Sequence, residues 1–138
     1  MNYFLDTNTC IYFLNGKFDA VRKHLQSTTP NNIKIPAIVK AELLFGAQKS
    51  KKKEDNTHKV GAFLLPYDII PFSDAAAVAY SHIRYEMERA GKPIGPNDLL
   101  IASIVLAEKG ILVTNNVSEF KRVPNLEITD WTTLEKDE

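Results

Sequence analysis

The sequence has little of what stabilises secreted proteins or anchors membrane proteins. Its 138 residues contain a single cysteine, Cys10, so an internal disulfide framework is excluded and a reducing compartment is favoured. No apolar run approaches the roughly 20 residues that span a bilayer. Met1 leads directly into strand-like sequence, without a basic and apolar leader. These absences predict a cytoplasmic protein.

The sequence also lacks net charge, with 17 basic and 17 acidic residues. This balance counts against a uniformly basic nucleic-acid-binding face. The charges are nevertheless uneven, because residues 1–70 hold ten Lys or Arg against six Asp or Glu, and residues 71–138 hold seven against eleven. The lysine run of Lys49 and 51–53 is typical of a solvated helix end, and a phosphate-facing patch is the alternative interpretation.

Several catalytic signatures are missing. There is no glycine-rich phosphate loop and no Cys/His cluster with zinc spacing. Cys10 has no base near it in the sequence, although a nucleophile and its base can meet in space. Asn8, two residues after Asp6, stands where phosphoaspartate chemistry usually requires a second acid. These absences disfavour nucleotide hydrolysis on a phosphate loop, zinc chemistry and phosphoaspartate chemistry.

What is present is a regular alternation of strand-like and helix-like segments. The length fits a single domain over 1–138, with 132–138 expected to form a frayed tail. The alternation predicts an α/β fold with three layers, in which helices cover both faces of a central parallel sheet of about four to five strands. The expected strands are 3–5, 33–35, 67–72, 111–113 and 126–128. The expected helices are 9–14, 18–26, 37–48 with Pro36 in its first turn, 54–65, 74–90 and 98–109, and a short turn is expected through Phe120.

Three acids occupy positions where a carboxylate is unexpected. Asp6 ends the first apolar strand, and the carboxyl ends of strands are where open α/β sheets bind ligands. Glu42 lies on an apolar helix stripe between Ile38 and Phe45, and Asp98 begins the apolar face of a later helix. We therefore expect all three acids at the same crevice.

Three clustered carboxylates need compensation, because buried like charges repel each other. A hard divalent cation with oxygen ligands provides it. Each acid also has an ordinary interpretation: Asp6 as a helix cap, Glu42 as a lysine partner or solvent-exposed group, and Asp98 as a first-turn acid that complements the helix dipole. Further hydrogen-bonding groups are expected around the same place, namely Thr7, Asn8, Thr114 and Asn116.

The ordered set of motifs resembles the PIN-domain ribonucleases, and in particular the VapC toxins of bacterial toxin–antitoxin pairs. The segments that carry the resemblance are Leu5–Asn8, Glu42 with 44–47, 95–98 with Ile101-Ala102, 113–116 with Glu119-Phe120, and Asp130-Trp131. They span essentially the whole chain in the family's order and with similar spacing.

The resemblance implies a metal-dependent endoribonuclease in which Asp6, Glu42 and Asp98 bind Mg²⁺ or Mn²⁺. It also implies a homodimer inhibited by a small antitoxin. Asn116 stands where many relatives carry a fourth acid, which disfavours a second tightly held metal. The resemblance implies that Asn116 orients a metal-bound water molecule. It also implies that Glu119 contributes negative charge from further away.

The family's chemistry implies in-line attack of water on phosphorus, leaving a 5′-phosphate and a 3′-hydroxyl. The suggested substrate is tRNA, with the anticodon loop of initiator tRNA as the specific expectation, and the basic residues at 49–53 could hold its backbone. The alternative from another class is a non-catalytic PIN-fold module that binds RNA or a protein partner. A metal-dependent DNA nuclease is the third candidate.

Overall fold

The protein is built on one five-stranded sheet in which every neighbouring pair of strands is parallel. The computed structural model describes residues 1–134. Along the sheet the strands follow the order β3-β2-β1-β4-β5, which confirms the expected parallel α/β architecture. The strands are β1 (Tyr3–Leu5), β2 (Ile33–Pro36), β3 (Asp68–Ile70), β4 (Ile111–Val113) and β5 (Glu127–Thr129).

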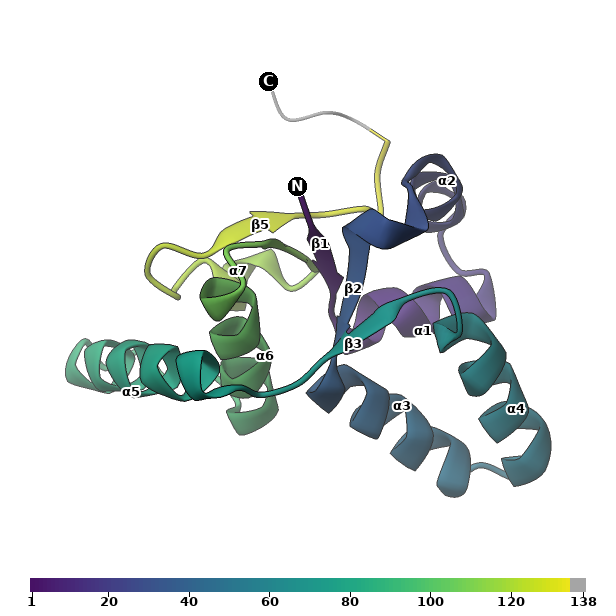
Figure 1. The fold of residues 1–138 in the computed structure, drawn as a ribbon, viewed down its shortest axis with the longest axis horizontal. Coiled ribbons are helices and arrows are strands. Elements are labelled where there is room, and N and C mark those ends of the chain that lie inside the picture. The colour runs from purple at the N-terminus through teal and green to yellow at the C-terminus, as the bar shows by residue number, and fades with distance from the viewer. Residues whose placement is uncertain (135–138) are drawn as a thin grey trace.

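Helices cover both faces of the sheet. Figure 1 shows α1 to α4 on one side of the strands and α5 to α7 on the other. The helices are α1 (Thr7–Asn15), α2 (Asp19–Ser27), α3 (Ala37–Gln48), α4 (Lys53–Leu64), α5 (Asp74–Arg89), α6 (Pro96–Ala107) and α7 (Val117–Phe120), with a 3₁₀ turn η1 at Pro30–Asn32. None of the helices in the described part of the chain is long and apolar enough to cross a membrane.

Local sequence signals explain where the helices begin and end. Asp6 caps α1 by accepting a hydrogen bond from the Thr9 amide, and Gly16 closes this helix with a positive φ of 66°. Ser73 caps α5 in the same way, through the Ala76 amide at 3.1 Å. These ends agree with the sequence prediction to within two residues.

The core lies between the three central strands and the helices on either side. Phe4, Leu5, Ile33, Leu112 and Val113 are all fully buried, as the nearly continuous apolar runs of a covered parallel sheet require. The edge strands β3 and β5 are only partly buried. A close approach occurs at Gly110, where an added Cβ would lie 2.4 Å from the Phe4 ring, so this position needs glycine.

The structure differs from the sequence prediction at several places, among them β3, which covers Asp68–Ile70 where a strand over 67–72 was expected. Pro36, expected in the first turn of a helix, is the last residue of β2 and precedes α3. Residues Val117–Phe120, expected as a turn, form the short helix α7. Phe45, expected on an apolar stripe of α3, is 65% exposed, because the core side of α3 is formed by Val39, Leu43 and Ala47.

The strand order reverses at β1, which pairs with β2 on one side and with β4 on the other. The connections from β1 run toward β3, whereas the chain returns to the opposite side of β1 at β4. Such a switch point opens a crevice beyond the carboxyl ends of the two strands. Asp6 follows β1 there, and Thr114 follows β4. Residues 135–138, part of the tail expected over 132–138, lie outside the described residues.

Candidate active site

Asp6 is placed by the end of β1 and the first turn of α1. Its amide donates to the Val113 carbonyl of β4 at 3.1 Å, and its Oδ1 accepts from the Thr9 amide at 2.9 Å. The side chain is 5% exposed, and this burial raises the pKa of its carboxyl group, although hydrogen bonds from Thr114 and Thr9 oppose the rise. Asp6 is therefore both the helix cap and a buried acid at the switch point.

Glu42 lies on α3, and both of its carboxylate oxygens accept hydrogen bonds. The Thr7 hydroxyl donates to Oε1, and the Asn97 amide donates to Oε2 at 3.2 Å. Thr7 belongs to α1 and Asn97 to α6, so Glu42 joins three helices across the crevice. No ion pair with lysine involves Glu42 in residues 1–134. Glu42 is half-buried and lines the crevice, beside the core side of α3 that Val39, Leu43 and Ala47 form.

Asp98 lies in the first turn of α6 and is half-buried. Its pKa is raised to about 7, first by burial, then by the charge of Glu119 and a hydrogen bond to it, and then by Asp6 and Glu42. Neighbouring negative charges oppose ionisation, and so does removal from water. Asp98 therefore shares its surroundings with three other carboxylates.

Asn116 and Glu119 approach the same place from the end of β4. Asn116 donates from Nδ2 to Glu119 Oε2 at 2.8 Å, while the Gly95 amide donates to Glu119 Oε1 at 3.1 Å. These two bonds lower the pKa of Glu119 and keep it charged. The family resemblance implied only a distant contribution of charge from Glu119, but the structure places its carboxylate against Asp98. The available signal was the spacing of three residues from Asn116, which is one turn of helix.

The four residues predicted as catalytic all line one hollow of ≈120 Å³ at the switch point. Its walls are Asp6, Thr7, Asn8, Glu42, Asp98, Asn116 and Phe120. The acids come from three different elements, so only the tertiary structure unites them. Within residues 1–134, no three acidic, histidine or cysteine side chains lie close enough together to hold a metal ion.

The chemistry of this hollow fits a hard divalent cation. Its ionisable donors are carboxylates, supplemented by the Asn116 amide and the Thr7 hydroxyl, and no thiol or imidazole lines it. Oxygen ligands of this kind suit Mg²⁺ or Mn²⁺. Burial raises the pKa of Asp98 most, and the charges of Glu119, Asp6 and Glu42 raise it further through a repulsion that a cation would relieve. Hydrogen bonds from Thr7 and Asn97 hold the Glu42 carboxylate at the hollow, and the bond from the Thr9 amide holds that of Asp6.

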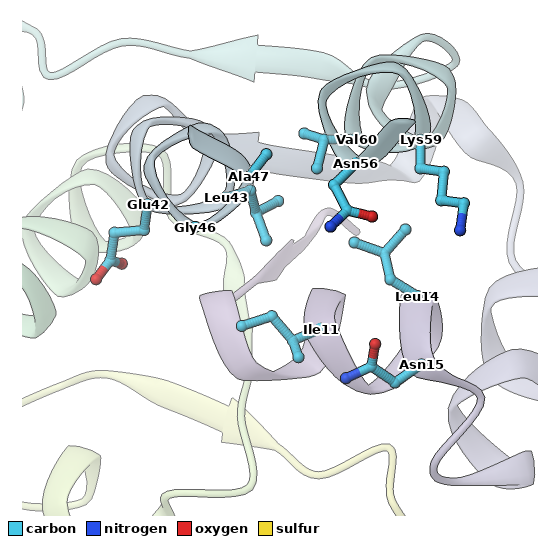
Figure 2. A pocket seen from close by; sticks show the side chains of 10 residues that line it. All are labelled: Ile11, Leu14, Asn15, Glu42, Leu43, Gly46, Ala47, Asn56, Lys59 and Val60. Carbon is cyan, nitrogen blue, oxygen red and sulfur yellow. The ribbon is translucent and has the colours of Figure 1, made fainter. Parts of the chain in front are cut away.

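Two further hollows adjoin the acids along α3. One of ≈610 Å³ begins at Thr7, Glu42 and Asn97 and reaches Phe45 and Lys49. The other, of ≈280 Å³, lies between α1, α3 and α4. Figure 2 shows it with Glu42 at one end and Lys59 at the other. Gly46 lines both hollows, so they meet at the same stretch of α3.

Comparison with known proteins agrees with this fold. The PIN domain matches residues 3–126. Ribonuclease VapC2 of Rickettsia felis is 48% identical over 95% of this chain and 98% of its own length. The tRNA(fMet)-specific endonuclease VapC of Salmonella typhimurium is 35% identical, over 95% of this chain and 98% of its own length.

A solved structure gives the same result in three dimensions. The crystal structure of VapBC2 from Rickettsia felis bound to a DNA fragment from their promoter contains a chain with a TM-score of 0.90. The match has 48% identity and covers 95% of this chain and 99% of that one. The protein therefore belongs to the PIN-domain family and, within it, to the VapC ribonucleases.

Proposed function

We propose that this protein is the toxin of a toxin–antitoxin pair and cleaves RNA as a divalent-metal-dependent endoribonuclease. The observation that carries the proposal is the single hollow at the switch point of the sheet, where Asp6, Glu42, Asp98 and Asn116 meet. Family membership supports it, since the matched relatives are named as ribonucleases. A bound Mg²⁺ or Mn²⁺ supplies charge neutralisation at the phosphate and lowers the pKa of the attacking water.

The role of each residue follows from how the structure holds its side chain. Asp6 and Asp98 provide the inner carboxylates, because each is held at a helix start, Asp6 as the cap of α1 and Asp98 in the first turn of α6. Glu42 is fixed by Thr7 and Asn97, which suits it either to bind the cation or to accept a proton from water. Asn116 donates to Glu119 through Nδ2, so its Oδ1 is the atom that would orient the water.

The substrate class follows from the openness of the site and from the relatives. A hollow reached from solvent admits a phosphodiester that a single-stranded loop exposes. One relative at 35% identity is named as a tRNA(fMet)-specific endonuclease, and we extend this specificity to the present chain as the first substrate to test. Cleavage would leave a 5′-phosphate and a 3′-hydroxyl, within the anticodon loop of initiator tRNA.

The partners are a cognate antitoxin and a second copy of this chain. Matched structures are VapBC complexes, including those from Rickettsia felis and Salmonella typhimurium. An antitoxin that covers the acidic hollow would exclude RNA and so inhibit the enzyme. A homodimer would place two such hollows on one particle.

The test is cleavage of purified tRNA by the wild type and by Asp6→Asn, with Mg²⁺ or Mn²⁺ and with EDTA. Asparagine caps a helix as well as aspartate does, so the variant keeps α1 while it removes the buried charge. We expect cleavage by Asp6→Asn to fall at least about 100-fold, since removing groups that only hydrogen-bond to a metal ligand already costs about 10- to 100-fold. Asp68→Asn, which alters an exposed acid at the start of β3, should cleave like wild type.

The same experiment separates the other two candidate functions. Equal background in all samples, together with RNA binding that needs no metal, would identify a non-catalytic binding module. Single-stranded DNA offered in parallel, and cut faster than tRNA, would identify a DNA nuclease.

A further inference from the structure

An aromatic ring stands in solvent one helical turn from the acidic hollow. Phe45 is 65% exposed, although it lies only three residues after Glu42 on α3. The next turn carries Lys49, whose ammonium group lies 5.1 Å from the centre of the Phe45 ring. Glu42, Phe45 and Lys49 thus follow one another along the helix, with ~5.4 Å per turn.

The Phe45 ring is not an isolated surface residue. It lines the ≈610 Å³ hollow that also contains Thr7, Glu42 and Asn97, so the surface beside the ring is continuous with the acids. The volume falls within the range of about 300–1,000 Å³ that small-molecule sites occupy. The floor is apolar, formed by Ile11, Ile38 and Ala41.

Charge changes sign along this surface. The end at Glu42 is acidic and holds a phosphate only when a cation neutralises the carboxylates. The end at Lys49 is basic without any added ion, and the exposed lysines of 51–53 follow it in the turn into α4. A polyanion that reaches the acids therefore meets a favourable potential on this side.

We propose that Phe45 and Lys49 form a nucleotide-binding subsite for single-stranded RNA next to the scissile phosphate. The base stacks on the Phe45 ring above the apolar floor, and the Lys49 ammonium binds the phosphate of that nucleotide. This subsite rests on the proposed ribonuclease function, because it places the neighbouring phosphodiester at Glu42 and the other acids. A flat ring with an adjacent cation matches a base joined to a phosphate, and stacking of this kind tolerates every base.

The test measures RNA binding and cleavage separately. A short fluorescein-labelled single-stranded RNA is titrated, by fluorescence anisotropy, with Asp6→Asn protein that also carries Phe45→Ala, Phe45→Tyr or Lys49→Gln. Loss of the ring should raise Kd about tenfold, whereas tyrosine should keep Kd within about twofold. In the otherwise wild-type protein, Phe45→Ala should raise KM for the same RNA far more than it lowers kcat.

The salt dependence identifies the phosphate contact. Lys49→Gln should raise Kd and reduce the slope of log Kd against log salt by about 0.7, the value for one phosphate of a single strand. Lys40→Gln is the matched control, because Lys40 is an exposed lysine of the same helix that does not line the hollow. Leu65→Ala, at a residue 86% exposed after α4, is the control for removing a solvent-exposed apolar side chain.

Each outcome decides the question. If wild type cleaves RNA with metal but Phe45→Ala and Lys49→Gln match their controls in Kd and salt slope, the subsite is wrong and the proposed function stands. If wild type does not cleave at all, the proposed function fails and the subsite fails with it. Phe45→Ala could also leave RNA binding unchanged and alter only the oligomer mass or the affinity for the co-expressed antitoxin. That result would assign the ring to a protein interface and overturn the subsite.

Discussion

At the scale of single residues, the structural and functional interpretations of the acids prove compatible. Asp6 caps α1 through Oδ1 and also lines the hollow, so the cap orients the carboxylate. Asp98 is a first-turn acid of α6 and also faces Glu119. A helix start holds a carboxylate in one direction, and it does so next to backbone dipoles that favour negative charge.

The raised pKa of Asp98 has a direct consequence for the metal-free protein. Its pKa is about 7 in the folded chain against an ordinary 3.8, so the native state keeps a proton that the unfolded chain releases. The associated stability is complete below about pH 4 and is lost as the pH rises to about 7. We expect Asp98→Asn to remove this pH-dependent loss of stability. The Tm of the metal-free protein at pH 8 should rise by ~4 °C, after allowance for solvent screening. The same substitution should abolish cleavage.

The measurement is a thermal melt in EDTA at several pH values between 4 and 8. Asp74→Asn is the matched control, because Asp74 is a first-turn acid of α5 outside the hollow. Its removal should leave Tm unchanged or slightly lower. A lower Tm for Asp98→Asn at pH 8 would mean that Asp98 acts mainly as a helix-dipole acid.

At the scale of elements, the short helix α7 holds the turn that leads into α6. Arg122, just after α7, donates to the Pro93 carbonyl at 3.3 Å, and Glu119 of α7 accepts from the Gly95 amide. Arg122 also lowers the pKa of Glu119 through its charge. The turn is thereby fixed at two points, and with it the position of Asp98 three residues after Gly95.

We expect Arg122→Gln to loosen this turn without unfolding the protein, since Arg122 is exposed. Cleavage should fall about tenfold or more, as when the outer-shell support of metal ligands is removed. Hydrogen exchange at the Gly95 amide should become faster, which a purely catalytic defect would not cause. Lys121→Gln is the neighbouring control, and an Arg122→Gln protein with unchanged exchange and cleavage would exclude this positioning role.

The sequence predicted the positions of the helices and strands more accurately than it predicted which side of each helix is buried. Hydrophobic periodicity predicted β4 to the residue and α3 to within one residue, because both carry strong local signals. It placed Phe45 on a buried stripe, yet only contacts with α1, α4 and α6 decide which side of α3 is covered. It also missed α7, because four residues are too few for a periodic pattern.

At the scale of the whole molecule, the hollow is assembled by elements that are far apart in the sequence. Asp6 follows β1, Glu42 lies in the middle of α3, and Asp98 lies in the first turn of α6. A cation bound there would bind the native state alone, because the unfolded chain does not bring these acids together. Ligand that binds only the native state stabilises it by RT ln(1 + [L]/Kd).

We therefore expect Mn²⁺ to raise the Tm of the wild type progressively, with ~2.7 kcal/mol of added stability when the ion is at about 100 times its Kd. Asp6→Asn should show little of this increase, and Asp68→Asn should show all of it. Differential scanning calorimetry over a series of Mn²⁺ concentrations provides the measurement. A wild-type Tm that does not respond to Mn²⁺ or Mg²⁺ would argue against a metal site in this hollow.

The sequence alone determined the alternation of strands and helices, the residues that end β1 and β4, and the three acids with their unusual positions. Those features are local, since they depend on side-chain periodicity, capping and the apolar content of short segments. Tertiary structure alone decided that Glu119 lies against Asp98, that Thr7 and Asn97 hold Glu42, and that Phe45 faces solvent. These depend on how distant segments pack around the reversal of strand order at β1, where burial and mutual repulsion of the acids become defined.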